Sequence, residues 1–400
     1  MKKVFLLAIC AAGFMMSFAQ TDGEIANPKT VKSKEANGKN ENGKENIPDN
    51  FTVEKRAAAT SVKDQAMTGT CWCFSATSLI ESQCLKNNLG EFDLSEMFSV
   101  RNIYVEKAKN YLLRQGHAQF GEGGLGHDLI RAIATYGAVP ETVYSGLKSG
   151  QTQHNHVKLQ ENLKKYLDSL LGKGTLPENW LAGYTNILDT TLGKVPEKFS
   201  YNGKLYTPKT FAEEVLKFNA NDYVYITSFT HHNYYEPFIL EVPDNFSNGA
   251  YYNVPLNEML QLTKDAVTKG YTVLWDADVS NDGFQQKMGS AINLASLPGV
   301  LKTKMSIVNG DIKEGKVDAE KRQQLFENLT TQDDHLMHIV GLEKSKTGNP
   351  FFLVKNSWGD IGRYHGYINV SESYFEINTI SLVVPKAALS KTLLEKLKLK

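Results

Sequence analysis

Residues 64–75, which read DQAMTGTCWCFS, place a cysteine at the point where a loop turns into a predicted helix. The spacing of apolar residues after Cys71 predicts a helix over residues 71–85. A thiol in the first turn lies at the positive end of the helix dipole, which lowers its pKa and favours the nucleophilic thiolate. Gln65, on the entering loop, is placed to donate to an oxyanion beside the backbone N–H of Cys71. Most free cysteines are ordinary small buried residues, so Cys71 becomes a candidate nucleophile only if a base reaches it.

A histidine and an asparagine late in the chain supply the partners that a thiol nucleophile needs. His335 begins a predicted strand, 335–342, and Asn356 ends the next one, 350–356. In a hairpin the two side chains would face each other at about 5 Å. Asn356 would accept a hydrogen bond from His335, while the other ring nitrogen meets Cys71 and forms a thiolate–imidazolium pair.

Several segments resemble the papain family of cysteine peptidases, and more closely its bleomycin hydrolase/aminopeptidase C branch. The resemblance covers about residues 51–390, and it places Thr68 where papain itself carries a disulfide cysteine. Its motifs are TGTCW at 68–72, GG at 123–124, YGAVP at 136–140, YTP at 206–208, TTQDDHLM at 330–337, VG at 340–341 and NSWG at 356–359.

The resemblance implies a role for each residue of these motifs. Cys71 would be the nucleophile, His335 the general base and acid, Asn356 the residue that orients His335, Gln65 the oxyanion donor, Trp358 the shield of the His–Asn bond, and Gly123 with Gly124 the binding site of an extended substrate backbone. No cofactor is implied.

The expected fold is α+β, with the two lobes of papain and a large insertion. The expected organisation is a signal peptide at 1–19, a disordered linker at 20–50, a helical lobe with the nucleophile at 51–150, an insertion of mixed α/β character at 151–330, a β lobe with His335 and Asn356 at 331–385, and a tail at 386–400. The predicted helices are 94–113, 128–136, 157–171, 210–218, 256–269 and 387–400, and the further strands are 223–227, 271–275 and 367–370.

The N-terminus predicts export. Two lysines, an apolar run and the small residues of Ser17-Phe18-Ala19 are typical of a secretory signal, so we expect a periplasmic or secreted protein without a stable membrane anchor. Of the four cysteines, three would remain after cleavage, an odd number that does not suit a disulfide framework.

Composition and the remaining polar residues exclude several classes of partner. The 44 basic and 44 acidic residues balance, so no nucleic acid is expected. The pairs His154/His156 and His231/His232 have no Cys or Glu companion at a ligand spacing, which argues against a metal site. His338 should point away from His335 and be structural. Asp276 and Asp278 are expected to be solvated or to cap a loop.

The sequence therefore predicts a thiol peptidase that hydrolyses peptides through a Cys-His-Asn acyl-enzyme mechanism, with an aminopeptidase favoured. A papain-like endopeptidase and a non-catalytic binding or assembly protein on the same scaffold are the alternatives. In the branch, the C-terminal carboxylate holds the free amine of the substrate, whereas this chain ends in the basic sequence LKLK. The resemblance also implies a homo-oligomer, since the branch often forms homohexamers.

Overall fold

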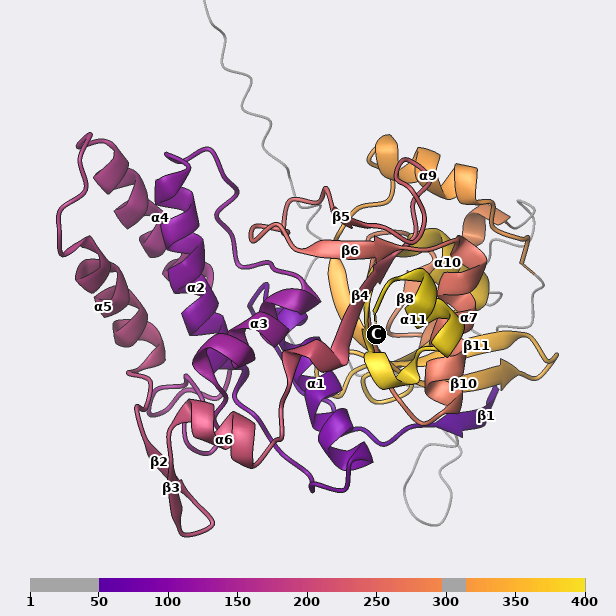
Figure 1. Cartoon of the computed structure of the whole chain (residues 1–400), viewed down its shortest axis with the longest axis horizontal. Coiled ribbons are helices and arrows are strands. Elements are labelled where there is room, and N and C mark those ends of the chain that lie inside the picture. Colours follow the sequence, from indigo (N-terminus) through magenta and orange to yellow (C-terminus); the bar gives the residue numbers. More distant parts are fainter. Residues whose placement is uncertain (1–49, 297–313, 400) are drawn as a thin grey trace, which may run out of the picture. The chain divides into compact units, whose positions relative to one another are not determined.

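The helix that begins at Cys71 packs on one face of a mixed β-sheet (Figure 1). The computed structural model describes residues 50–296 and 314–399, so the predicted signal peptide and nearly all of the linker lie outside the described residues. Helix α1, Cys71–Lys86, is buried along most of its length and contacts strand β10, His335–Ser345. Segments more than 250 residues apart in the sequence thus meet at the start of both elements.

The other N-terminal helices extend the layer that α1 begins (Figure 1). Helices α1, α2 and α3 pack against one another, and α4 and α5 form a pair beside α2. A short hairpin and one further helix follow them. The bounds are α2 Glu96–Leu113, α3 Gly126–Tyr136, α4 Val157–Leu171, α5 Trp180–Leu192, β2 Phe199–Tyr201, β3 Lys204–Tyr206 and α6 Pro208–Glu214.

Eleven strands of the described residues form the main sheet. Their order is β5-β6-β4-β13-β7-β10-β11-β12-β9-β8, and β1 pairs with β10 at a side position. The remaining bounds are β1 Phe51–Arg56, β4 Tyr223–Thr227, β5 Pro237–Ile239, β6 Ala250–Asn253, β7 Val273–Ala277, β8 Phe284–Gln285, β9 Ser290–Ala291, β11 Pro350–Lys355, β12 Tyr367–Ser371 and β13 Thr379–Pro385. Strands from the predicted insertion, β4 and β7, thus share one sheet with strands from the predicted β lobe.

The central strands alternate between two hydrophobic cores. Leu274 and Leu336 belong to the core shared with α1, α2 and α3, whereas Trp275 and Met337 belong to the core on the other side. Successive side chains of a strand point to opposite faces, which explains the alternation. The second core is covered by α7, Leu256–Thr268, and α10, Glu372–Asn378, with α9, Ala319–Glu327, beside α10 and α11, Lys391–Lys396, on α7. No helix of the described residues is both long and apolar enough to span a bilayer.

Most predicted elements are confirmed, two of them, 157–171 and 223–227, with the expected bounds. The helix predicted over 210–218 instead spans Pro208–Glu214, because Thr207 caps it and Pro208 occupies its first turn. The predicted C-terminal helix is shorter than expected and begins after the cap at Ser390. Strand β13, which is fully buried between β4 and β7, was not expected.

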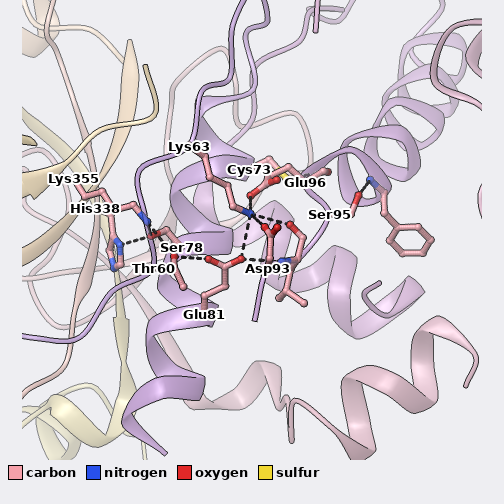
Figure 2. A network of polar contacts seen from close by, with 12 residues as sticks. Thr60, Lys63, Cys73, Ser78, Glu81, Asp93, Ser95, Glu96, His338 and Lys355 are labelled. Atoms are coloured by element: carbon pink, nitrogen blue, oxygen red, sulfur yellow. Dashed lines mark hydrogen bonds and ion pairs between the residues drawn. The ribbon is translucent and has the colours of Figure 1, made fainter. Parts of the chain in front are cut away.

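A buried network of charges holds α1 against the segments that precede and follow it (Figure 2). Glu81 of α1 is fully buried and accepts hydrogen bonds from Thr60 Oγ1 at 2.6 Å, the Leu94 amide at 2.9 Å and Lys63 Nζ at 3.3 Å. Lys63 also contacts Glu96 at 2.8 Å. Buried carboxylates need hydrogen-bond partners, and here the partners come from the segments before and after α1. The network therefore fixes the position of α1.

The same network joins α1 to the sheet, because Lys355 Nζ of β11 also donates to Thr60 Oγ1 at 3.1 Å (Figure 2). Ser78 Oγ lies 2.8 Å from His338 Nδ1, and Lys355 Nζ donates to the same oxygen at 2.8 Å. Ser75 Oγ donates to the Leu336 carbonyl at 2.5 Å. The prediction that His338 is structural is therefore confirmed, and its partner is the nucleophile helix.

We expect the variant Glu81→Ala to lose about 3 kcal/mol of unfolding free energy, because removing one partner leaves buried donors unpaired. Urea denaturation followed by circular dichroism measures the change. The matched control is Glu161→Ala on α4, whose ion pair with Lys158 is exposed, with a change below about 1 kcal/mol. Equal effects of the two substitutions would contradict the role assigned to the network.

Candidate active site

The side chains of His335 and Asn356 form a hydrogen bond of 2.7 Å between Nε2 and Oδ1. Asn356 Oδ1 also accepts from the Ser357 amide at 2.7 Å, and Asn356 Nδ2 donates to Gln286 Oε1 at 2.9 Å. These contacts fix the orientation of the carboxamide, so its oxygen faces His335 and Nε2 must carry the proton. In the neutral ring Nδ1 is then the free base, as the predicted mechanism requires.

The indole of Trp358 covers the imidazole of His335. The two rings stack with centroids 4.5 Å apart and an interplanar angle of 29°. His335 and Asn356 are 5% and 2% exposed. Trp358 thus lies where the resemblance expects it, and it limits access of water to the bond between His335 and Asn356.

The hairpin predicted for His335 and Asn356 forms, but the two residues are not opposite each other in its register. His338 pairs with Lys355 across β10 and β11, whereas His335 pairs with Ala277 of β7. The contact between His335 and Asn356 is made by the reach of the side chains at the end of the hairpin. Strand pairing alone would have placed them differently.

Gln65 is held by the residue that follows Asn356. Its Oε1 accepts from Ser357 Oγ at 2.7 Å, and its Nε2 donates to the Thr68 carbonyl at 2.7 Å. The backbone N–H of Gln65 also donates to the Ser357 carbonyl at 2.8 Å. One hydrogen of the Gln65 carboxamide remains for an oxyanion, and the amide at the start of α1 has no partner within the helix.

Cys71 is the first residue of α1, and its sulfur accepts a hydrogen bond from the backbone amide of Leu336. Leu336 directly follows His335 on β10. The thiol therefore lies beside the base that the sequence predicts for it. The side chain of Cys71 is 8% exposed, which leaves a narrow route to the sulfur.

Burial opposes the ionisation of this thiol when it is considered alone. Loss of water contact raises the pKa of Cys71 to about 12, the Leu336 amide lowers it, and Asp333 and Asp244 raise it further. The helix dipole contributes only about 0.3–1 kcal/mol, so it does not offset burial, and the expectation of a lowered pKa for Cys71 alone is not met.

The imidazole faces the same penalty, because burial lowers the pKa of His335 while Asn356 and Asp334 raise it. Transfer of the thiol proton to Nδ1 creates both charges at once, so the two groups titrate as a unit. The thiolate at this site depends on His335 rather than on the helix.

The glycine loop lies beside the residue that follows the nucleophile. Trp72 Nε1 donates to the Glu122 carbonyl at 3.0 Å, and a Cβ on Gly124 would lie 3.2 Å from the Trp72 ring. Lys107 Nζ donates to the carbonyls of Gly121, at 2.8 Å, and Gly123. The loop is therefore placed where the resemblance expects a binding site for the substrate backbone.

The structure corrects two expectations about polar residues. Asp278 caps a loop as predicted, accepting from the Ser280 and Gln332 amides, but Asp276 is 1% exposed and is not solvated. His231 and His232 do have a glutamate companion. Glu241 lies 3.3 and 2.7 Å from their Nε2 atoms, because β5 and the following loop return it to them.

The C-terminal segment lies on the other face of the sheet from α1. Leu393 and Leu397 belong to the core covered by α7, and Lys396 Nζ contacts Glu258 of α7 at 2.7 Å. A C-terminus placed in the active site, as the resemblance implies, is not what residues 386–399 show.

Two residues that the sequence did not single out complete the site. Gln286, next to β8, and Ser357 orient Asn356 and Gln65. Ser357 is part of the NSWG motif and offered a signal, whereas Gln286 offered none. Gln286 reaches Asn356 because β9 pairs with β12, and β8 with β9, at the edge of the sheet.

In the variant His335→Ala, the rate at which iodoacetamide alkylates Cys71 at pH 6 should fall by about 100-fold or more. Without the imidazole the thiol ionises alone, and its raised pKa places thiolate formation well above pH 9. The rate in the variant should therefore climb with pH through that range. Mass spectrometry of the Cys71 peptide measures it, and the variant Cys71→Ala corrects for Cys73 and Cys84. A rate equal to that of the unchanged protein at pH 6 would contradict the dependence on His335.

Comparison with known proteins finds relatives in the family that the sequence resembles. Residues 117–400 match the model of the Peptidase C1-like family, and residues 47–161 match that of the papain family cysteine proteases. Aminopeptidase C of Listeria monocytogenes is 25% identical over 382 residues, which cover 84% of this chain and 83% of the relative. Bleomycin hydrolase of Gallus gallus is 24% identical, with 82% and 81% covered.

A solved structure also resembles this fold over most of its length. The crystal structure of PepW from Lactobacillus rhamnosis aligns with a TM-score of 0.66 at 21% identity, covering 87% of this chain and 84% of that one. The α+β fold is therefore papain-like. Together with the matching family model, the arrangement of Cys71, His335 and Asn356 shows that this chain belongs to the Peptidase C1-like family of cysteine peptidases.

Proposed function

We propose that the protein is a thiol aminopeptidase, which removes residues from the amino terminus of peptides through an acyl-enzyme. The observation that carries the chemistry is the fixed orientation of Asn356, which leaves Nδ1 of His335 as the base beside the Cys71 sulfur. The relatives named aminopeptidase C support the exopeptidase activity.

Acylation follows from this geometry. The Cys71 sulfur attacks the carbonyl carbon as its proton passes to Nδ1 of His335, and the oxyanion is bound by Gln65 Nε2 and the Cys71 amide. The imidazolium then donates its proton to the leaving amine as the C–N bond breaks. Asn356 holds the ring in position throughout.

Deacylation uses the same groups in reverse. His335 takes a proton from water, the hydroxide attacks the thioester carbonyl, and the tetrahedral intermediate expels the Cys71 sulfur. The product leaves with a new carboxylate. Trp358 limits the access of bulk water, so the water that reacts must approach from the side of the departed amine.

The exopeptidase activity is tested with two fluorogenic substrates, an aminoacyl coumarin amide with a free amine and its N-acetylated analogue. We expect kcat/KM to be about tenfold or more higher for the free amine, since a paired ammonium group contributes at least one charge-assisted hydrogen bond. Preference for the blocked substrate would instead indicate an endopeptidase. Hydrolysis of neither, with an unreactive Cys71, would favour a non-catalytic scaffold.

The variant Gln65→Ala should lower kcat by about 100-fold to 1,000-fold, because it removes one oxyanion donor. KM should change little, since the interaction strengthens only in the transition state. The matched control is Gln83→Ala on α1, whose side chain bonds to Asn87 at the exposed end of the helix. An unchanged kcat in Gln65→Ala would remove Gln65 from the oxyanion site.

A further inference from the structure

The loop between β5 and β6, residues 240–249, is fastened to the start of α3. Ser247 Oγ donates to Asp128 Oδ1 at 2.8 Å and lies 2.7 Å from His127 Nε2. The side chain of Asn245 bonds to the backbone at both ends of the loop, at 2.7–2.9 Å. We call residues 240–249 the capping loop. Its own bonds and those to α3 give it a defined position beside the glycine loop that precedes α3.

The capping loop places a carboxylate on Gly123. A Cβ added to Gly123 would lie 1.8 Å from Asp244 Oδ2, so only a glycine permits this approach. Gln119 Nε2 donates to Asp244 Oδ1 at 3.1 Å. The nearby cation, Lys107, is occupied by the carbonyls of Gly121 and Gly123 and makes no ion pair with Asp244 among the described residues.

Two further carboxyl groups lie on the strands that carry the base. Asp276 of β7 is the register partner of Leu336, and Asp333 precedes His335 by two residues. Asp276 Oδ2 accepts from Ser381 Oγ at 3.0 Å. Burial raises the pKa of Asp276 to about 7, and a hydrogen bond with the carboxyl of Asp333 opposes this rise. No lysine, arginine or histidine of the described residues forms an ion pair with either group.

These carboxyl groups lie close enough to influence the nucleophile. Asp333, Asp244 and Asp276 each raise the pKa of the Cys71 thiol, in addition to burial. The neighbouring Asp128 differs from them, because it forms an ion pair with Arg131. Lys107 offsets part of the charge on Asp244, and the remaining negative charge opposes the thiolate that a peptidase needs.

We infer that Asp244, with Asp276 and Asp333 behind it, binds a cationic nitrogen of the peptide substrate, and that this nitrogen is the free α-ammonium of the residue to be removed. This inference rests on the proposed aminopeptidase function. The α-nitrogen is separated from the attacked carbonyl carbon by a single carbon atom, so its partner must lie beside the nucleophile, as these carboxyl groups do.

The cation has an effect on the chemistry as well as on binding. A bound ammonium offsets the negative charges that oppose ionisation of Cys71, so the thiolate is favoured when a substrate with a free amine is present. An N-acetylated peptide offers no charge and leaves the amide to be placed against carboxylates. Selection for a free amine then follows from the site itself and needs no C-terminal carboxylate.

The variant Asp244→Asn, made in the full chain, tests the assignment. For the aminoacyl coumarin amide with a free amine we expect kcat/KM to fall about tenfold or more, mainly through KM, because Asn keeps the shape and loses the charge. For the N-acetylated analogue we expect no fall. The matched control is Asp168→Asn, an exposed carboxylate on α4, which should change neither substrate. Asp244→Ser also removes the charge, so it should act like Asp244→Asn and provides a second test if one variant folds poorly.

The source of the cation is decided by a second pair of substrates, the coumarin amides of N-acetyl-Lys-Ala and N-acetyl-norleucine-Ala. Equal rates for the two in the unchanged protein, with a preference for free amines, support the α-ammonium. A preference for the lysine peptide that is lost in Asp244→Asn supports a cation site but assigns it to a side chain, and then the aminopeptidase proposal fails while the carboxylates keep their role.

Two results would overturn the inference and leave the aminopeptidase activity standing. One is a preference for free amines that is as strong in both Asp244→Asn and Asp244→Ser as in the unchanged protein. The other is loss of the preference on treatment with EGTA and its recovery with Ca²⁺, which would show that the carboxylates hold a metal ion instead.

Discussion

The active site depends on the contact between the first two turns of α1 and the first residues of β10. Ser75 donates to the Leu336 carbonyl and Ser78 contacts His338, so two hydroxyl groups align the helix with the strand. This alignment brings the Cys71 sulfur to the Leu336 amide, one residue from His335. Glu81 completes the attachment one turn further along α1, through Thr60, Lys63 and the Leu94 amide. A nucleophile and a base that are distant in sequence are thereby held by polar groups that take no part in the reaction.

Directional hydrogen bonds then determine the chemistry at each atom. The Ser357 amide and Gln286 fix Asn356, Asn356 fixes the tautomer of His335, and Ser357 Oγ fixes Gln65. Each of these side chains keeps a single free hydrogen-bonding role, because its neighbour already occupies the other donor or acceptor atom. Residues 356 and 357 thus serve the base and the oxyanion donor together, which explains why the loop after β11 contacts the loop before α1.

The electrostatics of the site differ from what a cysteine at a helix start suggests. Burial and nearby carboxylates both disfavour the thiolate, and a histidine that is itself penalised by burial must compensate. The carboxylates therefore indicate a cation-binding role, since they oppose formation of the Cys71 thiolate unless a cation binds to them. The capping loop places Asp244 against Gly123, whereas Leu393 and Leu397 of the C-terminal segment pack into the apolar core covered by α7.

Local sequence was sufficient for much of this protein. Helix α1, strand β4 and the hairpin of β10 and β11 follow from the period of their apolar residues, and Cys71, His335, Asn356 and Gln65 follow from motifs that are short and contiguous. The approach of Asp244 to Gly123, the contact of the buried Asp276 with Asp333, and the support of Asn356 by Gln286 did not follow. Each joins residues more than 50 positions apart through side chains on a loop or a sheet edge, where no periodic pattern records the partner. Only the packing of the sheet against α1 and α3 decided them, because charge and hydrogen bonding act through distance in space and not along the chain.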